Sequence, residues 1–233
     1  MRVPRRRRAR GFGKGPKRTK IFVLCEGDTE MVAIRHFIRP YWESQGLKSV
    51  SLHPVNLWGK LDDIFGHVVR ARKDPKVMAI FTLIDLYEMK RVIHRWDASL
   101  DEKVGQALDW LRIGGAPPEL KDEFGSESMR DFYRPHLSVH EVEAWLLADG
   151  SCIHQDVKPL EGAEEKDMLN PPKARVKKLL SKMRRQVHYS EVIDGIRMFQ
   201  KARFDVVYES CPYFKAFYDD LESVTKTALQ SEA

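Results

Sequence analysis

Two short apolar runs, each followed at once by an acidic residue, constrain the fold of this 233-residue chain more than any other feature. The first run covers residues 21–25 and precedes Glu26, and the second covers residues 77–84 and precedes Asp85. Continuous apolar runs of this length are typical of strands that are buried on both faces. Ligands gather at the carboxyl ends of such parallel strands, so Glu26 and Asp85 would converge if their strands are neighbours.

The remaining pattern predicts an α/β fold. A helix is expected after the first strand, and Pro40 should kink or end it. A strand over residues 51–57 contains Pro54, which favours a position at the edge of the sheet. A further strand over residues 134–139 leads into a helix over residues 140–148. This alternation predicts a mostly parallel sheet with helices on both faces.

The pattern changes after Asp149, where no further strand of comparable strength follows. Helices are expected over residues 173–185, 191–202 and 213–224. We therefore predict three parts: a disordered basic tail over residues 1–20, an α/β domain over residues 21–150, and a C-terminal helical appendage over residues 151–233 packed on the same domain.

Positive charge is concentrated in two segments. Residues 1–20 contain ten Arg or Lys and no acid, and the other 30 basic residues face 34 acidic ones, which leaves residues 21–233 at about −4. Such a tail is expected to be disordered and can neutralise phosphates, or it is a solubility extension without a dedicated role. The helix over residues 173–185 carries seven cations, which either guide a phosphate backbone or form a solvated face. The candidate nucleic-acid contacts are Arg5, Arg6, Arg7 and Arg8 in the tail, and Lys173, Arg175, Lys177, Lys178, Lys182, Arg184 and Arg185 on the helix.

A third acidic element follows the strand over residues 134–139. His140 and Glu143 are three residues apart, so they would share one face of the expected helix. Glu143 could be a metal ligand, and His140 could be a ligand, a proton shuttle or a phosphate contact. The alternative is structural: Glu26 caps a helix, Asp85 begins a loop, and the helix start at residue 140 is solvated.

Carboxylates that converge at one place repel one another unless a cation neutralises them. Oxygen ligands with room for water and phosphate suit Mg²⁺ or Mn²⁺. Such ions activate water and stabilise the charge on a transferred phosphoryl group. On the residues alone, a metal site for phosphoryl chemistry and the structural alternative therefore both remain open.

Three segments resemble a known family. Residues 24–30, Leu-Cys-Glu-Gly-Asp-Thr-Glu, resemble the E-G-x-T-E opening of Toprim-like proteins. Residues 84–87 are similar to their second acidic strand, and residues 140–147 to a third block. Together they resemble the Toprim-related DUF4276 family and, more distantly, the Toprim nucleases of phage-defence systems that work beside an ABC-type ATPase, including the overcoming-lysogenization-defect nucleases. The resemblance covers roughly residues 20–150.

The resemblance implies a Toprim fold, a magnesium site, and nicking or cleavage of DNA or RNA. Glu26 matches the invariant Toprim glutamate, and Asp85 matches the first aspartate of the D-x-D pair. The second position of that pair is Tyr87, which makes Glu143 the natural substitute ligand and Glu88 a weaker one. The implied metal ligands are thus Glu26, Asp85 and Glu143, with His140 as a further catalytic candidate.

Other chemistries lack their motifs. The glycine-rich residues 11–15 precede the first strand and do not form a phosphate-binding loop of the G-x-x-x-x-G-K-[ST] type. No C-x-x-C or H-E-x-x-H pattern occurs, and Cys25, Cys152 and Cys211 lie far apart, which is typical of a reducing compartment. Apolar stretches are too short to cross a bilayer, so we expect a cytoplasmic protein.

The leading hypothesis is a metal-dependent nuclease in a bacterial defence system with an ATPase partner. The alternative is a Toprim-like scaffold without catalysis that acts as a nucleic-acid-binding or adaptor protein. A third hypothesis is a toxin-like enzyme that acts on tRNA or nucleotides. DNA and RNA both remain open as substrates, and so does the oligomeric state.

Overall fold

The computed structural model describes residues 19–164, 171–183 and 189–231. Within them a five-stranded sheet has the order β2-β1-β3-β4, with β5 beside β4 along the same edge of β3, and every pairing is parallel. The strands are β1 (Thr19–Cys25), β2 (Val50–Asn56), β3 (Val77–Asp85), β4 (Tyr133–Arg134) and β5 (Leu137–Ser138). The predicted mostly parallel α/β sheet is confirmed, and β1 begins two residues before the expected boundary.

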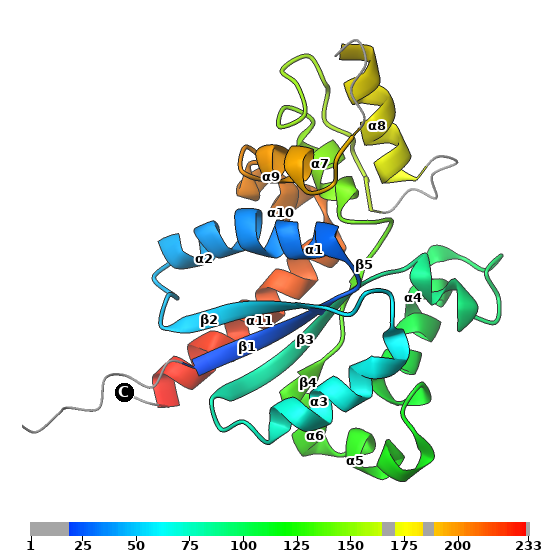
Figure 1. The fold of residues 1–233 in the computed structure, drawn as a ribbon, viewed down its shortest axis with the longest axis vertical. Coiled ribbons are helices and arrows are strands. Elements are labelled where there is room, and N and C mark those ends of the chain that lie inside the picture. Colours follow the sequence, from blue (N-terminus) through cyan, green and yellow to red (C-terminus); the bar gives the residue numbers. More distant parts are fainter. Residues whose placement is uncertain (1–18, 165–170, 184–188, 232–233) are drawn as a thin grey trace, which may run out of the picture.

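Helices cover both faces of the sheet (Figure 1). Alternate strand residues point to opposite faces, so Val23 packs in one apolar cluster and Leu24 in the other. The first cluster is covered by α1 (Asp28–Ala33), α2 (Arg39–Ser44), α7 (Glu143–Asp149), α8 (Pro172–Met183), α9 (Ile193–Phe199), α10 (Phe204–Ser210) and α11 (Pro212–Ser231). The second is covered by α3 (Ile64–Arg72), α4 (Leu100–Asp109), α5 (Lys121–Gly125) and α6 (Glu127–Phe132). Burial on both faces explains the continuous apolar runs of β1 and β3.

The first helix does not end at Pro40. A π-helical turn over Ile34–Ile38 joins α1 to α2, and helical backbone continues to Ser44. Proline has no N–H for the helical ladder, and a widened turn just before it is a known way to accommodate that loss. Ile34, Phe37 and Ile38 therefore stay buried against the sheet.

The position of β2 follows from its proline. Pro54 lies opposite Val23 of β1, and β2 is the outermost strand of the sheet, as predicted.

The strand expected over residues 134–139 is interrupted. β4 ends at Arg134, Pro135 and His136 intervene, and β5 resumes at Leu137. Both pieces pair with β3, with Phe81 opposite Arg134 and Asp85 opposite Ser138. Proline cannot donate to the ladder, which accounts for the break.

The C-terminal helices are joined to the sheet domain by buried carboxylates. Asp149, which has no exposed surface, accepts hydrogen bonds from the backbone N–H and the guanidinium of Arg203. Glu164, also fully buried, accepts from the indole N–H of Trp145 and from the backbone N–H of Phe214 in the first turn of α11. These contacts explain why the helical appendage packs on the same domain.

Three short helices were not anticipated: α5, α6 and α10. Each has seven residues or fewer, which is too short for a periodic pattern to stand out in the sequence. Among the residues described, no helix is long and apolar enough to span a membrane.

Candidate functional site: an acidic rim at the carboxyl edge of the sheet

The two acid-ending strands are neighbours. β1 pairs with β3 so that Cys25 lies opposite Leu83, which sets Glu26 level with Ile84 and one residue from Asp85 along the strand direction. Both carboxyl groups therefore lie at the same edge, as the sequence predicted. Asp85 is buried and accepts a hydrogen bond from the Tyr87 N–H over 2.8 Å, whereas Glu26 is half-buried. Tyr87, the residue at the second position of the expected acidic pair, thus fixes the orientation of Asp85.

His140 does not lie on the helix. His140 and Glu141 both have left-handed backbone, with φ of 60° and 68°, and α7 begins only at Glu143. The prediction that His140 and Glu143 share a helical face is therefore wrong. Two consecutive non-glycine residues in this conformation are strained and turn the chain sharply where β5 leaves the sheet. His140 is nevertheless buried at the rim, with its ring centroid 5.8 Å from that of Tyr87.

Glu143 occupies the first turn of α7 and is 2% exposed. Its Oε1 accepts a hydrogen bond from the Tyr189 hydroxyl over 3.0 Å. Burial, reinforced by the nearby charges of Glu141 and Glu30, raises the pKa of Glu143 to about 8. The side chain is thus held in a site that disfavours its ionised form.

The other carboxyls of the rim show the same behaviour. Burial raises the pKa of Glu26 to about 7, with the charges of Glu88 and Glu141 adding to the effect. Burial also raises the pKa of Asp85 well above its usual value, with Glu141, Glu30 and Glu26 contributing. Burial is thus the main reason why the ionised forms of these carboxyls are disfavoured, and nearby carboxylates add to it.

Sequence reasoning did not identify Glu30 and Glu141 as neighbours of the predicted ligands. Glu30 is buried in α1, and its carboxylate accepts a hydrogen bond from the Gly27 N–H over 3.0 Å, which gives it a structural role at the helix start. Glu141 influences the pKa values of Glu26, Asp85 and Glu143 alike, so it is the common neighbour of the three predicted ligands. The left-handed backbone at residue 141 creates this position, and no sequence period signals it.

Residues from the C-terminal region complete the rim. The backbone N–H of Lys173, at the start of α8, donates to Glu141 over 2.8 Å, and its ammonium lies 2.6 Å from Glu191. Glu191 also accepts from the Thr29 hydroxyl. Burial alone would raise the pKa of Glu191, but Lys173 holds it below its usual value. Lys173, whose role as a phosphate contact stays a prediction, is engaged with carboxylates of this chain.

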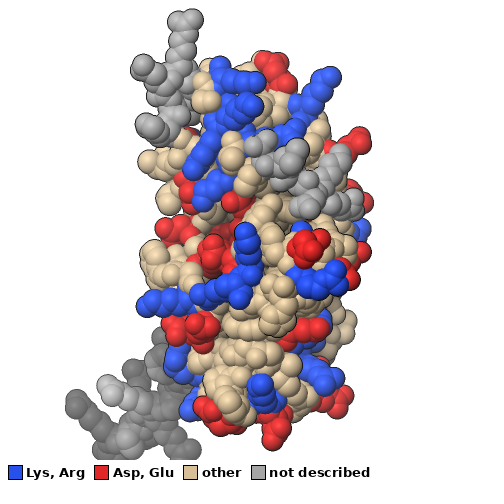
Figure 2. Space-filling view, turned by 90° about the vertical axis from the view of Figure 1, so that its right-hand side faces the viewer, with Lys and Arg blue, Asp and Glu red and all other residues tan. Residues whose placement is uncertain are grey.

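The other predicted nucleic-acid contacts on α8 are exposed where the structure describes them. These are Arg175, Lys177, Lys178 and Lys182. Arg5, Arg6, Arg7, Arg8, Arg184 and Arg185 lie outside the described residues. Figure 2 looks at the side toward which the strands' carboxyl ends point and shows Lys and Arg gathered over the upper part, where α8 lies, with Asp and Glu interspersed with Lys and Arg in the middle.

The donor chemistry of the rim fits a hard divalent cation, since carboxylate oxygens are what Mg²⁺ and Mn²⁺ prefer. Burial is the main cause of the raised pKa values of these carboxyls, and the charge of Glu141 adds to it at Glu26, Asp85 and Glu143. In the described parts of the chain, however, no group of three or more His, Cys, Asp or Glu side chains is arranged to hold a metal ion. A metal would therefore have to draw these side chains closer together.

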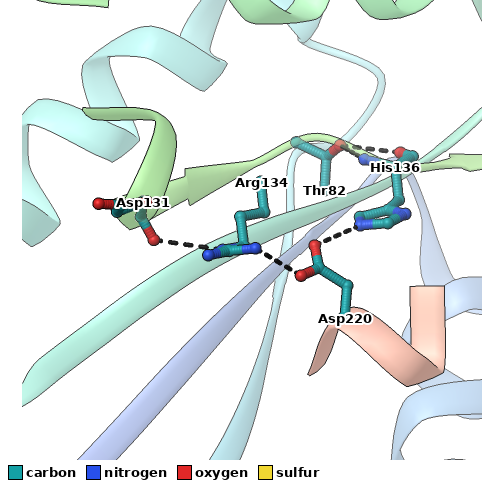
Figure 3. A network of polar contacts seen from close by, with 5 residues as sticks. All are labelled: Thr82, Asp131, Arg134, His136 and Asp220. Carbon is teal, nitrogen blue, oxygen red and sulfur yellow. Dashed lines mark hydrogen bonds and ion pairs between the residues drawn. The ribbon is translucent and has the colours of Figure 1, made fainter. Parts of the chain in front are cut away.

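A separate cavity of about 630 Å³ lies away from the rim, beside β4. Its wall includes Arg134, His136 and Asp220, and none of the predicted catalytic or metal-binding residues. Asp220 of α11 bonds to both Arg134 and His136, while Thr82 exchanges hydrogen bonds with the backbone of His136 (Figure 3). This network accounts for the attachment of α11 to the edge of the sheet.

Comparison with known proteins identifies one family. The sequence model described as "Domain of unknown function (DUF4276)" matches residues 25–222. No match was found among curated proteins or solved structures. The matched range includes the whole acidic rim and most of the C-terminal helices, which extends well beyond the residues that carry the sequence resemblance.

Proposed function

The chain belongs to the DUF4276 family, whose function is unknown, and we propose that it is a metal-dependent nuclease that cleaves phosphodiester bonds of DNA or RNA. One observation carries the proposal: β1 and β3 are neighbours, so Glu26 and Asp85 lie at the same edge of the sheet, and the charge of Glu141 acts on both of them and on Glu143. Burying several carboxyl groups near one another lowers the stability of the fold, and groups with shifted pKa values are concentrated at catalytic sites.

In this proposal Glu26, Asp85 and Glu143 hold Mg²⁺ or Mn²⁺. The bound ion would supply an activated water and stabilise charge on the phosphate. Glu141 lies among the three proposed ligands and adds negative charge that favours the cation. In the same proposal His140, which is buried beside Tyr87, moves a proton, and its left-handed backbone supports a functional role.

The exposed cations of α8 support a polyanionic substrate. Arg175, Lys177, Lys178 and Lys182 are exposed on a helix whose first residues, including Lys173, contact the rim. A phosphate backbone attracted to α8 would then pass close to the carboxylates. The proposal also includes a Toprim-like fold and an ATPase partner, because the resemblance of residues 24–30, 84–87 and 140–147 implies both. Co-purification of proteins with the full chain tests for the partner.

The direct test is cleavage of plasmid, single-stranded DNA and RNA with Mg²⁺ or Mn²⁺. Cleavage by the wild type should be lost in Glu26→Gln and Asp85→Asn, because each variant removes a charged ligand while keeping its shape. The matched control is Glu43→Gln, an exposed acid in the last turn of α2. Wild-type cleavage that persists in both rim variants would refute the assignment of the site.

A catalytically inactive nucleic-acid-binding or adaptor protein is the second candidate. It is favoured by the side chain at the second acidic position, Tyr87, and by the lack of an assembled metal-binding group among the residues described. This candidate predicts salt-sensitive nucleic-acid binding with no turnover in any metal.

A further inference from the structure

Trp58 is exposed in a way that the other tryptophans are not. Its side chain is 72% exposed, whereas Trp42 and Trp145 are buried and Trp96 and Trp110 are partly buried. An indole is the largest apolar side chain, and placing it in water forgoes the stabilisation that burial would give. Its surroundings in the sequence are polar, with Asn56 two residues before it and Lys60 two residues after it.

The backbone around Trp58 is fixed to the acidic rim. The Leu57 N–H donates to the Cys25 carbonyl over 2.8 Å, and the Gly59 N–H donates to the Glu26 carbonyl over 3.1 Å. The Trp58 N–H donates to the Asn56 side chain over 2.7 Å. Trp58 is thus held immediately beside Glu26, across one strand spacing of about 5 Å.

The conformation of Trp58 is strained as well as fixed. Its φ is 54°, in the left-handed region that a bulky residue rarely adopts. Gly59, with φ of 71°, follows in the same turn. If residue 58 were there only to form the turn, glycine would adopt this backbone conformation at a lower steric cost. The exposed tryptophan ring therefore needs a different explanation.

We infer that Trp58 stacks on an unpaired nucleobase and so positions a single strand of DNA or RNA across the acidic rim. The inference rests on the proposed function and adds its substrate class. Aromatic rings stack on any base, and a nearby cation contacts the backbone, a role that exposed Lys60 can fill. Bases in a duplex are stacked on one another, so an unpaired base is the form that the ring can reach.

A protein partner explains the exposed ring less well. A stable protein interface buries on the order of 1,200 Å² or more in total, most often around a group of apolar residues. Trp58 stands alone on its loop, beside half-buried Asn56 and exposed Lys60 and Asp62. A single flat ring among polar neighbours suits one base.

The test measures binding of labelled single-stranded DNA, single-stranded RNA and duplex DNA to the full chain, in Ca²⁺ and in EDTA. Trp58→Ala should weaken single-strand binding by about tenfold, while Trp58→Phe, which keeps a ring, should retain most of it. Ile113→Ala removes another exposed apolar side chain far along the sequence and should have no effect. Single strands should also quench wild-type tryptophan fluorescence, and the quenching should be lost in Trp58→Phe.

The outcomes separate this inference from the nuclease proposal. Trp58-dependent binding of single strands without cleavage in Mg²⁺ or Mn²⁺ overturns the nuclease proposal and supports the stacking role. Equal affinities of wild type and Trp58→Ala, or affinity for duplex equal to that for single strands, overturn the stacking role even if cleavage occurs. Absence of single-strand binding in both buffers overturns it too.

Discussion

The hydroxyl of Tyr189 donates a hydrogen bond to the Glu143 carboxylate over 3.0 Å, although the two residues are 46 positions apart. Glu143 begins α7 at the rim, and Tyr189 lies just before α9 in the C-terminal region. The contact makes the C-terminal region part of the site. Both residues lie within the range that the family model matches, residues 25–222.

Tyr189→Phe should lower the free energy of unfolding by about 1–3 kcal/mol, because it leaves a buried carboxyl without this donor. Urea unfolding followed by circular dichroism measures the change. The double variant Tyr189→Phe/Glu143→Gln provides the control, since the amide needs the hydroxyl less than the carboxylate does. Additive effects of the two substitutions would show that this bond contributes nothing specific.

The strands and their terminal acids could be predicted from the sequence because they depend on local properties. Continuous apolar runs specify strands buried on both faces, and an acid directly after each run marks a strand end. Pro54 in β2 predicted an edge strand from an equally local property, because proline has no N–H to donate to a neighbouring strand. Glu26 and Asp85 thus followed from composition and position alone.

The rest of the site depends on chain reversals and distant contacts. His140 and Glu141 adopt left-handed backbone that their residue types do not favour, so the helix was predicted three residues too early. Lys173 lies in a segment, residues 173–185, whose composition is typical of a solvated helix face. Its contacts with Glu141 and Glu191 arise only from tertiary packing. No local period encodes such partners.

Divalent metal should stabilise the protein through the rim. Mn²⁺ at about 100 times its dissociation constant would raise the free energy of unfolding by about 2.7 kcal/mol, and EDTA should reverse the gain. Thermal unfolding with and without Mn²⁺ measures this effect. The gain should vanish in Glu26→Gln/Asp85→Asn and persist in Glu43→Gln. An equal gain in the double rim variant would place the cation elsewhere.

Asp220 should make stability depend on acidity. Burial would raise its pKa, but the hydrogen bond from His136 and the charge of Arg134 together hold the pKa below its usual value. The ionised group therefore stabilises the fold above about pH 4, and this contribution is lost as pH falls through the lowered pKa. At pH 7 Asp220→Asn should cost about 1–2 kcal/mol, and the gap to wild type should close toward pH 3. Urea unfolding of both proteins from pH 7 to pH 3 measures the gap, and a gap that stays constant would contradict the assignment.

Trp58→Gly should stabilise the protein even though it removes the largest exposed side chain. A left-handed conformation costs a non-glycine residue about 1–2 kcal/mol, while glycine adds about 0.5–1 kcal/mol of unfolded-state entropy, so relief of strain wins by a few tenths to about 1 kcal/mol. Trp58→Ala keeps the left-handed backbone and lacks the ring, so the difference in stability between the two variants is the relief of strain minus the entropy cost of glycine. Urea unfolding followed by circular dichroism compares them.

Both variants should bind single strands equally weakly, because neither presents a ring at residue 58. Trp58→Gly would then combine higher stability with weaker binding, as expected where a residue is kept for function at a cost in stability. If Trp58→Gly is no more stable than Trp58→Ala, the strain of the backbone at φ of 54° does not exceed the entropy cost of glycine. The conformation of Trp58 would then give no support to a functional role, and the exposure of its side chain would be the remaining evidence for stacking.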